Sequence, residues 1–217
     1  NPLSPDLTAR EIDLAHLPAP HAPRLAMVAN GWGALKNPQP AMRAFARLRA
    51  RIPGARLQLY GTDFGPNQAA AQWARQQGID AGMEFIGRIA HTRLYSALAT
   101  TDVLLHPSLE ESFGMSVAEA MALGVPVIGG THSGAVPWVI GDGGLVTDVT
   151  SASAIETSVN TLLQAPEYRR LRTAAVARTR ALFSIGQITD IYISHYCHLI
   201  DKTGTSTPNF GDSRIRK

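Results

Sequence analysis

Short apolar runs alternate with longer amphipathic stretches along most of this chain. The runs are rich in Val, Leu, Ile and Ala, which is typical of strands that a parallel sheet buries on both faces. Apolar residues in the stretches between them recur at helical spacing, which predicts helices. The predicted strands are residues 25–29, 55–60, 83–86, 103–106, 125–129 and 144–146, and the predicted helices are residues 40–51, 68–77, 92–99, 115–123 and 154–163.

Because strand and helix alternate in order, the sequence predicts an α/β fold, a Rossmann-like parallel sheet with helices on both faces. Residues 167–200 predict two further helices, broken around residues 184–186. A sheet of this kind binds its ligands at the carboxyl ends of its strands. The loops that follow the strands are therefore the places where chemistry is expected.

The two ends of the chain differ from this pattern. Residues 1–23 carry five prolines and no long periodic segment, which predicts an interdomain linker rather than a fold element. Residues 202–217 are polar and rich in Thr, Ser, Gly and Asn, which predicts a disordered tail. One domain is expected between them, over residues 24–201. The chain does not begin with Met, and we expect it to be a fragment of a longer protein.

Composition excludes several classes of protein. The 217 residues are 45% hydrophobic and 17% charged, which is typical of a globular domain. The formal net charge is +3 with the arginines scattered, which indicates a solvated surface and no nucleic-acid partner but leaves association with a membrane surface open. Cys197 is the only cysteine, so no disulfide can form within the chain. No apolar stretch reaches the ~18 residues that span a bilayer, and we expect a cytoplasmic protein without a signal peptide.

The sequence predicts neither a metal nor a cofactor. Its seven histidines are dispersed and show no metal-binding spacing. The segment Gly31-Trp32-Gly33 begins like a dinucleotide fingerprint, but Lys36 stands where the third glycine would be, which argues against NAD. Trp32 and His106 are expected to be packing residues.

The loop after the fourth predicted strand and the helix behind it carry two carboxylates, Glu111 and Glu119. Ser112 is predicted to be the N-cap, with the helix starting near Gly114. Free backbone N–H groups at a helix start are a natural seat for a diphosphate. Two carboxylates beside such a seat would repel phosphate, so they are better suited to accept hydrogen bonds from sugar hydroxyls. The N–H groups expected at the seat belong to Gly114, Met115 and Ser116.

Residues 107–127 resemble the signature of the retaining glycosyltransferases of family four. That signature reads Pro-Ser, then Glu-x-Phe-Gly-x-x-x-x-Glu-Ala-x-Ala-x-Gly-x-Pro-Val, and this chain is similar to it throughout. Enzymes of this family have the GT-B architecture of two Rossmann-like domains. The resemblance implies that the chain is the C-terminal, nucleotide-sugar-binding domain of such an enzyme.

The same resemblance implies a role for each residue of the motif. The first glutamate, Glu111, would contact the donor sugar, and the second, Glu119, would bind the ribose hydroxyls. The backbone between them would complete the site, with the sugar contacted at Phe113 and Gly114 and the diphosphate held at Met115 and Ser116.

Residues 27–38 resemble the first strand and loop of the family's donor domain, where a lysine precedes Gly or Asn and a helix. The resemblance implies that Lys36 binds the phosphates and offsets the negative charge on the leaving diphosphate, with Gly31 and Gly33 bordering the donor. Most members carry an arginine five residues before this lysine, where this chain has Gly31 beside Asn30. Either Lys36 acts alone, or another cation compensates, Arg88 first, or the activity is weak.

Two further loops resemble parts of the family's donor site. Residues 85–89 are similar to the strand and loop that border the nucleotide base, which makes Arg88 and Ile89 candidate base contacts. Residues 129–137 are similar to a loop that borders the donor sugar, where Ser133 and Gly134 would approach the donor. His132 in that loop is expected to be structural.

The resemblance covers residues 1–200 and implies transfer of a sugar from a nucleotide diphosphate sugar to an acceptor with retention of anomeric configuration. The amino-terminal domain, which would bind an acceptor glycan or lipid-linked sugar, is absent, so the fragment alone is expected to be inactive. The family's common use points to lipopolysaccharide or other surface polysaccharide, made at the inner face of the membrane. A non-catalytic nucleotide- or partner-binding module and a sugar-nucleotide epimerase of GT-B build are the alternatives, and the Glu-x-Phe-Gly segment speaks against the epimerase.

Overall fold

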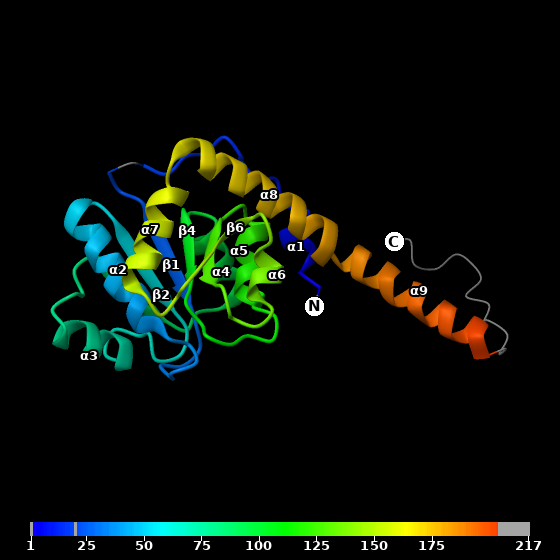
Figure 1. Ribbon diagram of the computed structural model, residues 1–217, viewed down its shortest axis with the longest axis horizontal. Helices are drawn as coiled ribbons and strands as arrows, with labels where there is room; N and C mark the ends of the chain where they lie inside the picture. The colour runs from blue at the N-terminus through cyan, green and yellow to red at the C-terminus, as the bar shows by residue number, and fades with distance from the viewer. Residues whose placement is uncertain (1, 20, 204–217) are drawn as a thin grey trace.

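The computed structural model describes residues 2–19 and 21–203 as a parallel sheet with helices on both of its faces (Figure 1). The sheet has six strands in the order β3-β2-β1-β4-β5-β6, and every neighbouring pair is parallel. All six predicted strands are confirmed, with small differences at their ends. They are β1 (Arg24–Val28), β2 (Arg56–Tyr60), β3 (Met83–Gly87), β4 (Val103–His106), β5 (Val127–Gly130) and β6 (Gly144–Thr147).

Two hydrophobic clusters cover the two faces of the sheet, as the predicted fold requires. One cluster contains buried residues of α2 (Pro38–Arg51), α3 (Ala69–Gln76) and α7 (Ala152–Leu162). The other contains residues of α4 (His91–Leu98), α5 (Met115–Ala122) and α6 (Val136–Ile140). Every residue of β4 and β5 is buried, because these central strands have a helix layer on each side.

The predicted linker contains a fold element that the sequence pattern missed. Helix α1 (Pro5–Thr8) buries Leu7, and Leu3 before it is equally buried, each with 2% of its surface exposed. The N–H of Leu3 donates to the carbonyl of Phe183 at 2.8 Å. A helix of four residues is too short to show periodicity, so the prediction of no fold element here is wrong. That this segment connects two domains stays a prediction.

The carboxyl-terminal part of the described chain forms two long helices. α8 (Ala165–Phe183) is followed by Ser184 in an extended conformation, and α9 (Ile185–Thr203) begins at the next residue, which confirms the predicted break. Figure 1 shows α9 extending away from the sheet and its covering helices. Exposed apolar side chains along it include Ile191, Tyr192 and Tyr196. The predicted tail begins inside α9, and residues 204–217 lie outside the described residues.

The order of the strands creates the site for a ligand. From β1 the chain adds β2 and then β3 on one side, and it then crosses back to place β4 on the other side of β1. Open α/β sheets bind ligands at such a switch point, outside the carboxyl ends of the two strands. Here the strands that meet are β1 and β4, with Met27 paired with Leu105 near those ends.

Candidate functional site

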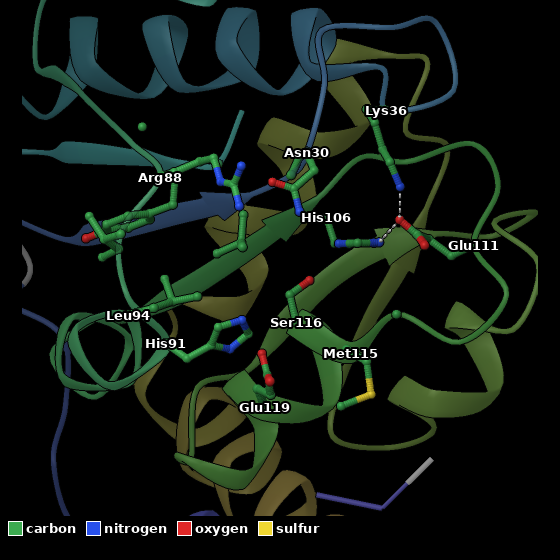
Figure 2. Close-up of a pocket in the computed structure, with 17 residues that line it drawn as sticks. Asn30, Lys36, Arg88, His91, Leu94, His106, Glu111, Met115, Ser116 and Glu119 are labelled. Atoms are coloured by element: carbon green, nitrogen blue, oxygen red, sulfur yellow. Dashed lines mark hydrogen bonds and ion pairs between the residues drawn. The ribbon is translucent and has the colours of Figure 1, made fainter. Parts of the chain in front are cut away.

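A cavity of about 400 Å³ lies at the carboxyl ends of β1 and β4 (Figure 2). The loops after the first four strands and the start of α5 form its walls. Most of the predicted site residues line this cavity, although sequence places them far apart. Those that line it are Lys36, Arg88, Ile89, Glu111, Gly114, Met115, Ser116 and Glu119.

Lys36 and Glu111 form an ion pair on one side of the cavity. Lys36 Nζ donates a hydrogen bond to Glu111 Oε1 at 2.5 Å, and His106 Nε2 lies 3.6 Å from the same oxygen. Burial raises the pKa of the Glu111 carboxyl, but the hydrogen bond from Lys36 and the charges of His106 and Lys36 outweigh it and hold this pKa below its ordinary value. Glu111 is therefore a charged hydrogen-bond acceptor at neutral pH.

Hydrogen bonds between two loops hold this pair together. Asn37, in the left-handed conformation with φ of 47°, donates from Nδ2 to the carbonyls of Pro107 at 3.1 Å and Val149 at 3.0 Å. The N–H of Leu109 donates to the carbonyl of Leu35 at 2.7 Å. The loop after β1 is thereby fixed to the loop after β4, which sets Lys36 opposite Glu111.

The start of α5 faces the cavity with free backbone donors. None of the hydrogen bonds found among the described residues uses the N–H of Met115 or Ser116. The predicted N-cap is wrong: Gly114 occupies that position with φ of 86°, and the exposed Ser112 makes no capping bond. A glycine begins the helix because the backbone must take a left-handed turn there. Its absent side chain also leaves room for Val136 Cγ2, which a Cβ would meet at 3.3 Å.

Glu119 lies at another side of the cavity, on the second turn of α5. It is only 6% exposed, and Tyr95 donates its hydroxyl to Glu119 Oε1 at 3.0 Å. Burial raises the pKa of the Glu119 carboxyl, while the hydrogen bond from Tyr95 and the nearby His91 oppose that rise. The pKa of Tyr95 is itself raised to about 12, by burial and by Glu119. Sequence reasoning missed Tyr95, since no motif links α4 to the second glutamate.

Residues that follow β1 and β3 complete the opposite wall. Arg88 and Ile89 follow β3, and Asn30 follows β1. In Figure 2 the Arg88 side chain extends from its loop toward Asn30 and the interior of the cavity. Asn30 Oδ1 accepts a hydrogen bond from the N–H of Thr62 at 3.2 Å, which fixes its side chain. Arg88 is thus a cation on the cavity wall besides Lys36.

Three predicted donor contacts lie behind the cavity wall instead. Ser133 is 1% exposed and donates its hydroxyl to the carbonyl of Ser108. Gly134, with φ of 59°, packs its backbone against the carbonyl of Glu111, where a side chain would collide. Phe113 packs edge-on against Phe183, with ring centroids 5.4 Å apart. These residues support the loop that carries Glu111 rather than line the cavity.

The glycines before Lys36 shape their loop without lining the cavity. The N–H of Gly31, which has φ of 104°, donates to the carbonyl of Thr62 at 3.2 Å, and the Gly33 carbonyl accepts from the N–H of Lys36 at 3.0 Å. Trp32 between them packs against Phe64 and Trp73, which confirms it as a packing residue.

His106 is buried, as predicted, but it also lines the cavity. Burial lowers its pKa to about 4, the Glu111 charge opposes that change, and the Lys36 charge adds to it. The imidazole is therefore neutral at neutral pH. A single histidine at a strand end has no partner in a sequence motif, so its place beside Glu111 could not be read from spacing.

Residues 2–19 and 21–203 contain no cluster of three or more His, Cys, Asp or Glu side chains arranged to hold a metal ion. Among the helices of that same part of the chain, none is long and apolar enough to span a membrane.

Comparisons with known proteins agree on one family. Residues 10–179 match the profile of the family described as "Glycosyl transferases group 1". The D-inositol 3-phosphate glycosyltransferase of Mycobacterium tuberculosis (strain ATCC 25618 / H37Rv) is 31% identical over 170 residues, which make up 75% of this chain and 34% of that protein. The chain spans about a third of the length of the curated relatives it matches.

Solved structures share the fold at lower identity. Alr3699/HepE of Anabaena, in complex with UDP and glucose, superposes with a TM-score of 0.69 at 19% identity over 82% of this chain and 49% of that one. The C-terminal domain of a glycosyl transferase group 1 family protein (LpcC) of Francisella tularensis superposes with a TM-score of 0.63 at 18% identity. That match covers 81% of this chain and 100% of the Francisella domain.

Proposed function

Because this chain belongs to the family of glycosyl transferases group 1, we propose that it binds the nucleotide diphosphate sugar of a retaining, family-four enzyme of GT-B architecture. The observation that carries the proposal is a single cavity lined by Glu119, the first amides of α5, and Lys36 with Glu111. These groups suit the ribose, the diphosphate and the sugar of one donor molecule. The complex of the similarly folded HepE with UDP and glucose supports this class of ligand.

Each part of the cavity would hold one part of the donor. Glu119, held by Tyr95, would accept hydrogen bonds from the ribose hydroxyls. The amides of Met115 and Ser116, at the positive end of the α5 dipole, would hold the diphosphate. Arg88 and Ile89 would border the base. Gly31, Gly33, Phe113, Ser133 and Gly134 would act through the backbone and loops that they position.

The chemistry follows from where charge develops. As the bond between the anomeric carbon and the diphosphate breaks, negative charge grows on the diphosphate and positive charge on the carbon. Lys36 and the helix amides would offset the negative charge on the diphosphate. The Glu111 carboxylate would orient the sugar and stabilise the positive charge on the anomeric carbon. To reach the phosphates, the Lys36 ammonium must leave or share the Glu111 oxygen that it contacts at 2.5 Å.

One cation of the family pattern is replaced. Gly31 stands where most members carry an arginine, and we propose that Arg88 supplies the second positive charge from the loop after β3. Its side chain extends toward the cavity interior from the wall opposite Lys36 (Figure 2). A diphosphate on the α5 amides would then lie between two cations.

The complete enzyme would need more than this domain. The full-length match to an isolated C-terminal domain supports a C-terminal position for this chain. Acceptor binding would belong to the other half, so the fragment alone should bind the donor without transferring the sugar. We propose an acceptor glycan or lipid-linked sugar of lipopolysaccharide or another surface polysaccharide, used in the cytoplasm at the inner membrane face. Association of the full-length protein with anionic vesicles would test that placement.

Calorimetric titration of the 217-residue chain with UDP, GDP and ADP tests the donor-binding role. We expect micromolar to millimolar binding of one nucleotide, weakened at least tenfold by Glu119→Ala, since a buried acceptor of two hydroxyls is lost. Glu167→Ala, on the exposed side of α8, is the matched control and should bind like the wild type. Absence of nucleotide binding by the wild-type chain would contradict the proposal.

The replaced arginine favours a second candidate, a nucleotide-binding module without transferase activity. A product assay on the full-length protein with the donor that calorimetry identifies separates the candidates. Transfer of the sugar to acceptor with retained configuration supports the proposal. Binding without turnover supports the module, and an isomerised sugar nucleotide supports the epimerase.

A further inference from the structure

His106 lines the cavity and has a buried side-chain nitrogen without a hydrogen-bond partner among the described residues. This atom is Nε2, and 3% of the residue is exposed. Leaving such an atom without a partner is destabilising, so folded proteins rarely keep one. Because His106 also lines the cavity, a molecule bound there can supply the missing partner.

The neighbouring carboxylate restricts what that partner can be. His106 Nε2 and Glu111 Oε1 are 3.6 Å apart, too far for a good direct hydrogen bond. An oxygen atom placed about 2.8 Å from each of them would close a triangle with both. In Figure 2 the imidazole and the carboxylate point toward each other across this space.

The bridging group must both accept and donate a hydrogen bond. The charged Glu111 carboxylate can only accept, so the group must donate to it. A nitrogen lone pair facing a carboxylate is repelled, which favours the tautomer with the proton on Nε2, so His106 donates. A phosphate oxygen or a carbonyl can only accept at this position, whereas a hydroxyl group can do both.

We infer that His106 is a sugar-selecting residue, whose Nε2–H binds one hydroxyl group of the donor sugar together with the Glu111 carboxylate. This inference rests on the proposed function, because it takes the sugar end of the donor to lie at Glu111. It adds a contact from the end of β4 to those that the motif residues make. Lys36 and Glu111 are the charged side chains whose interactions reach this imidazole. A burial that lowers its pKa to about 4 keeps it a neutral donor at physiological pH.

Three substitutions of His106 test the inference in calorimetric titrations of the chain. The probes are the nucleotide diphosphate that binds the wild type and its glucose, galactose, mannose and N-acetylglucosamine derivatives. His106→Leu removes the donor, His106→Asn keeps an amide that is too short to reach, and His106→Gln places an amide N–H near the position of Nε2. If the Leu variant does not fold, the comparison of His106→Gln with His106→Asn still shows whether a donor at the position of Nε2 is needed.

The measured quantity is the ratio of the affinities for the best sugar nucleotide and the bare nucleotide diphosphate. We expect His106→Leu and His106→Asn to lower this ratio roughly 5- to 10-fold, the effect of one hydrogen bond. His106→Gln should restore most of it, and affinity for the bare diphosphate should stay within about twofold of the wild type. A deoxy sugar nucleotide that lacks the bridging hydroxyl should not distinguish wild type from variants.

An equal loss for sugar nucleotide and bare diphosphate would overturn the inference, since His106 would then act on the nucleotide or on packing. An unchanged ratio in the Asn and Leu variants would overturn it as well. Failure of the wild-type chain to bind any nucleotide is a different result, which contradicts the proposed function itself.

Discussion

Lys36 Nζ and Glu111 Oε1 are 2.5 Å apart, although the two side chains are expected to serve different parts of one donor. In the proposed complex, the Lys36 ammonium would bind the diphosphate and the Glu111 carboxylate would bind the sugar. The hydrogen bond between them therefore competes with at least one of these tasks. Each side chain is partly buried, with 28% and 19% of its surface exposed, so the attraction is only partly screened by solvent.

Glu111→Gln should tighten the binding of a nucleotide diphosphate while it removes the proposed contact with the sugar. The substitution frees Lys36 for the phosphates and removes a negative charge beside them. We expect a dissociation constant for UDP, or for the nucleotide that binds, about two- to fivefold lower, as for a loss of competition worth up to about 1 kcal/mol. Isothermal calorimetry at low and high salt measures it.

Glu110→Gln, one residue earlier and exposed, is the control for charge alone. It should leave the affinity nearly unchanged. Weaker nucleotide binding by Glu111→Gln would show that the carboxylate supports the nucleotide directly, which contradicts the competition argument.

Tyr95→Phe should make nucleotide binding more sensitive to acid. The hydroxyl of Tyr95 donates to Glu119 and lowers a carboxyl pKa that burial has raised. Without it this pKa rises further, so Glu119 takes up a proton at higher pH and loses the charge that the proposed ribose contact uses. The pH at which affinity falls to half should therefore move upward. Titrations from about pH 8 to about pH 5 measure it, and Tyr192→Phe on the exposed α9 should give the wild-type curve.

His106 should make the chain less stable in mild acid. Its pKa is about 4 when folded, against an ordinary value of 6.5, so between these values the unfolded chain binds a proton that the folded chain does not. Stability from this group is complete above pH 6.5 and is lost as pH falls toward 4, by about 3 kcal/mol in total. Urea unfolding across this range measures the slope. His106→Gln should flatten it, and His132→Gln, at an exposed position, should not.

Gly114→Ala should destabilise the chain and disturb the start of α5. Its φ of 86° costs an L-residue about 1–2 kcal/mol, and a Cβ would press on Val136. Gly186→Ala is the matched control, because its φ is not positive and no atom lies within 4 Å of the added carbon. That variant should be neutral or slightly more stable. Equal unfolding free energies for the two variants would contradict the role given to the left-handed turn.

The strands could be predicted because the sequences of buried parallel strands are unbroken apolar runs. Two helices could not: α1 and α6 are too short for their periodicity to be visible, and both are held by packing against other elements. The prediction of Ser112 as the N-cap of α5 is wrong for a different reason. Ser112 has the better side chain for capping, but the chain turns two residues later, where only a glycine tolerates the backbone conformation.

The motif residues that meet in the cavity could be predicted because a short segment at the β4–α5 junction carries most of them. Their partners come from elsewhere in the chain. Asn30 lines the cavity and Tyr95 reaches Glu119 because β1 and α4 pack where they do, which no local pattern encodes. Ser133 and Gly134 follow β5, close enough to be taken for ligand contacts, yet they face the back of the Glu111 loop. The roles of all these residues toward a donor stay predictions.

The crossover that brings β4 beside β1 also governs when the site can exist. Lys36 and Glu111 are 75 residues apart. The strands before them, β1 and β4, can pair only after the chain of β2 and β3 has been synthesised. Such long-range contacts form late, because closing the long intervening loop lowers the entropy of the chain before the contacts can stabilise it. A ribosome-bound chain that has emerged as far as β3 carries the lysine without its counterpart. Nucleotide affinity should therefore appear during synthesis only after α5 has docked, and it reports that the strands on the two sides of the switch point have come together.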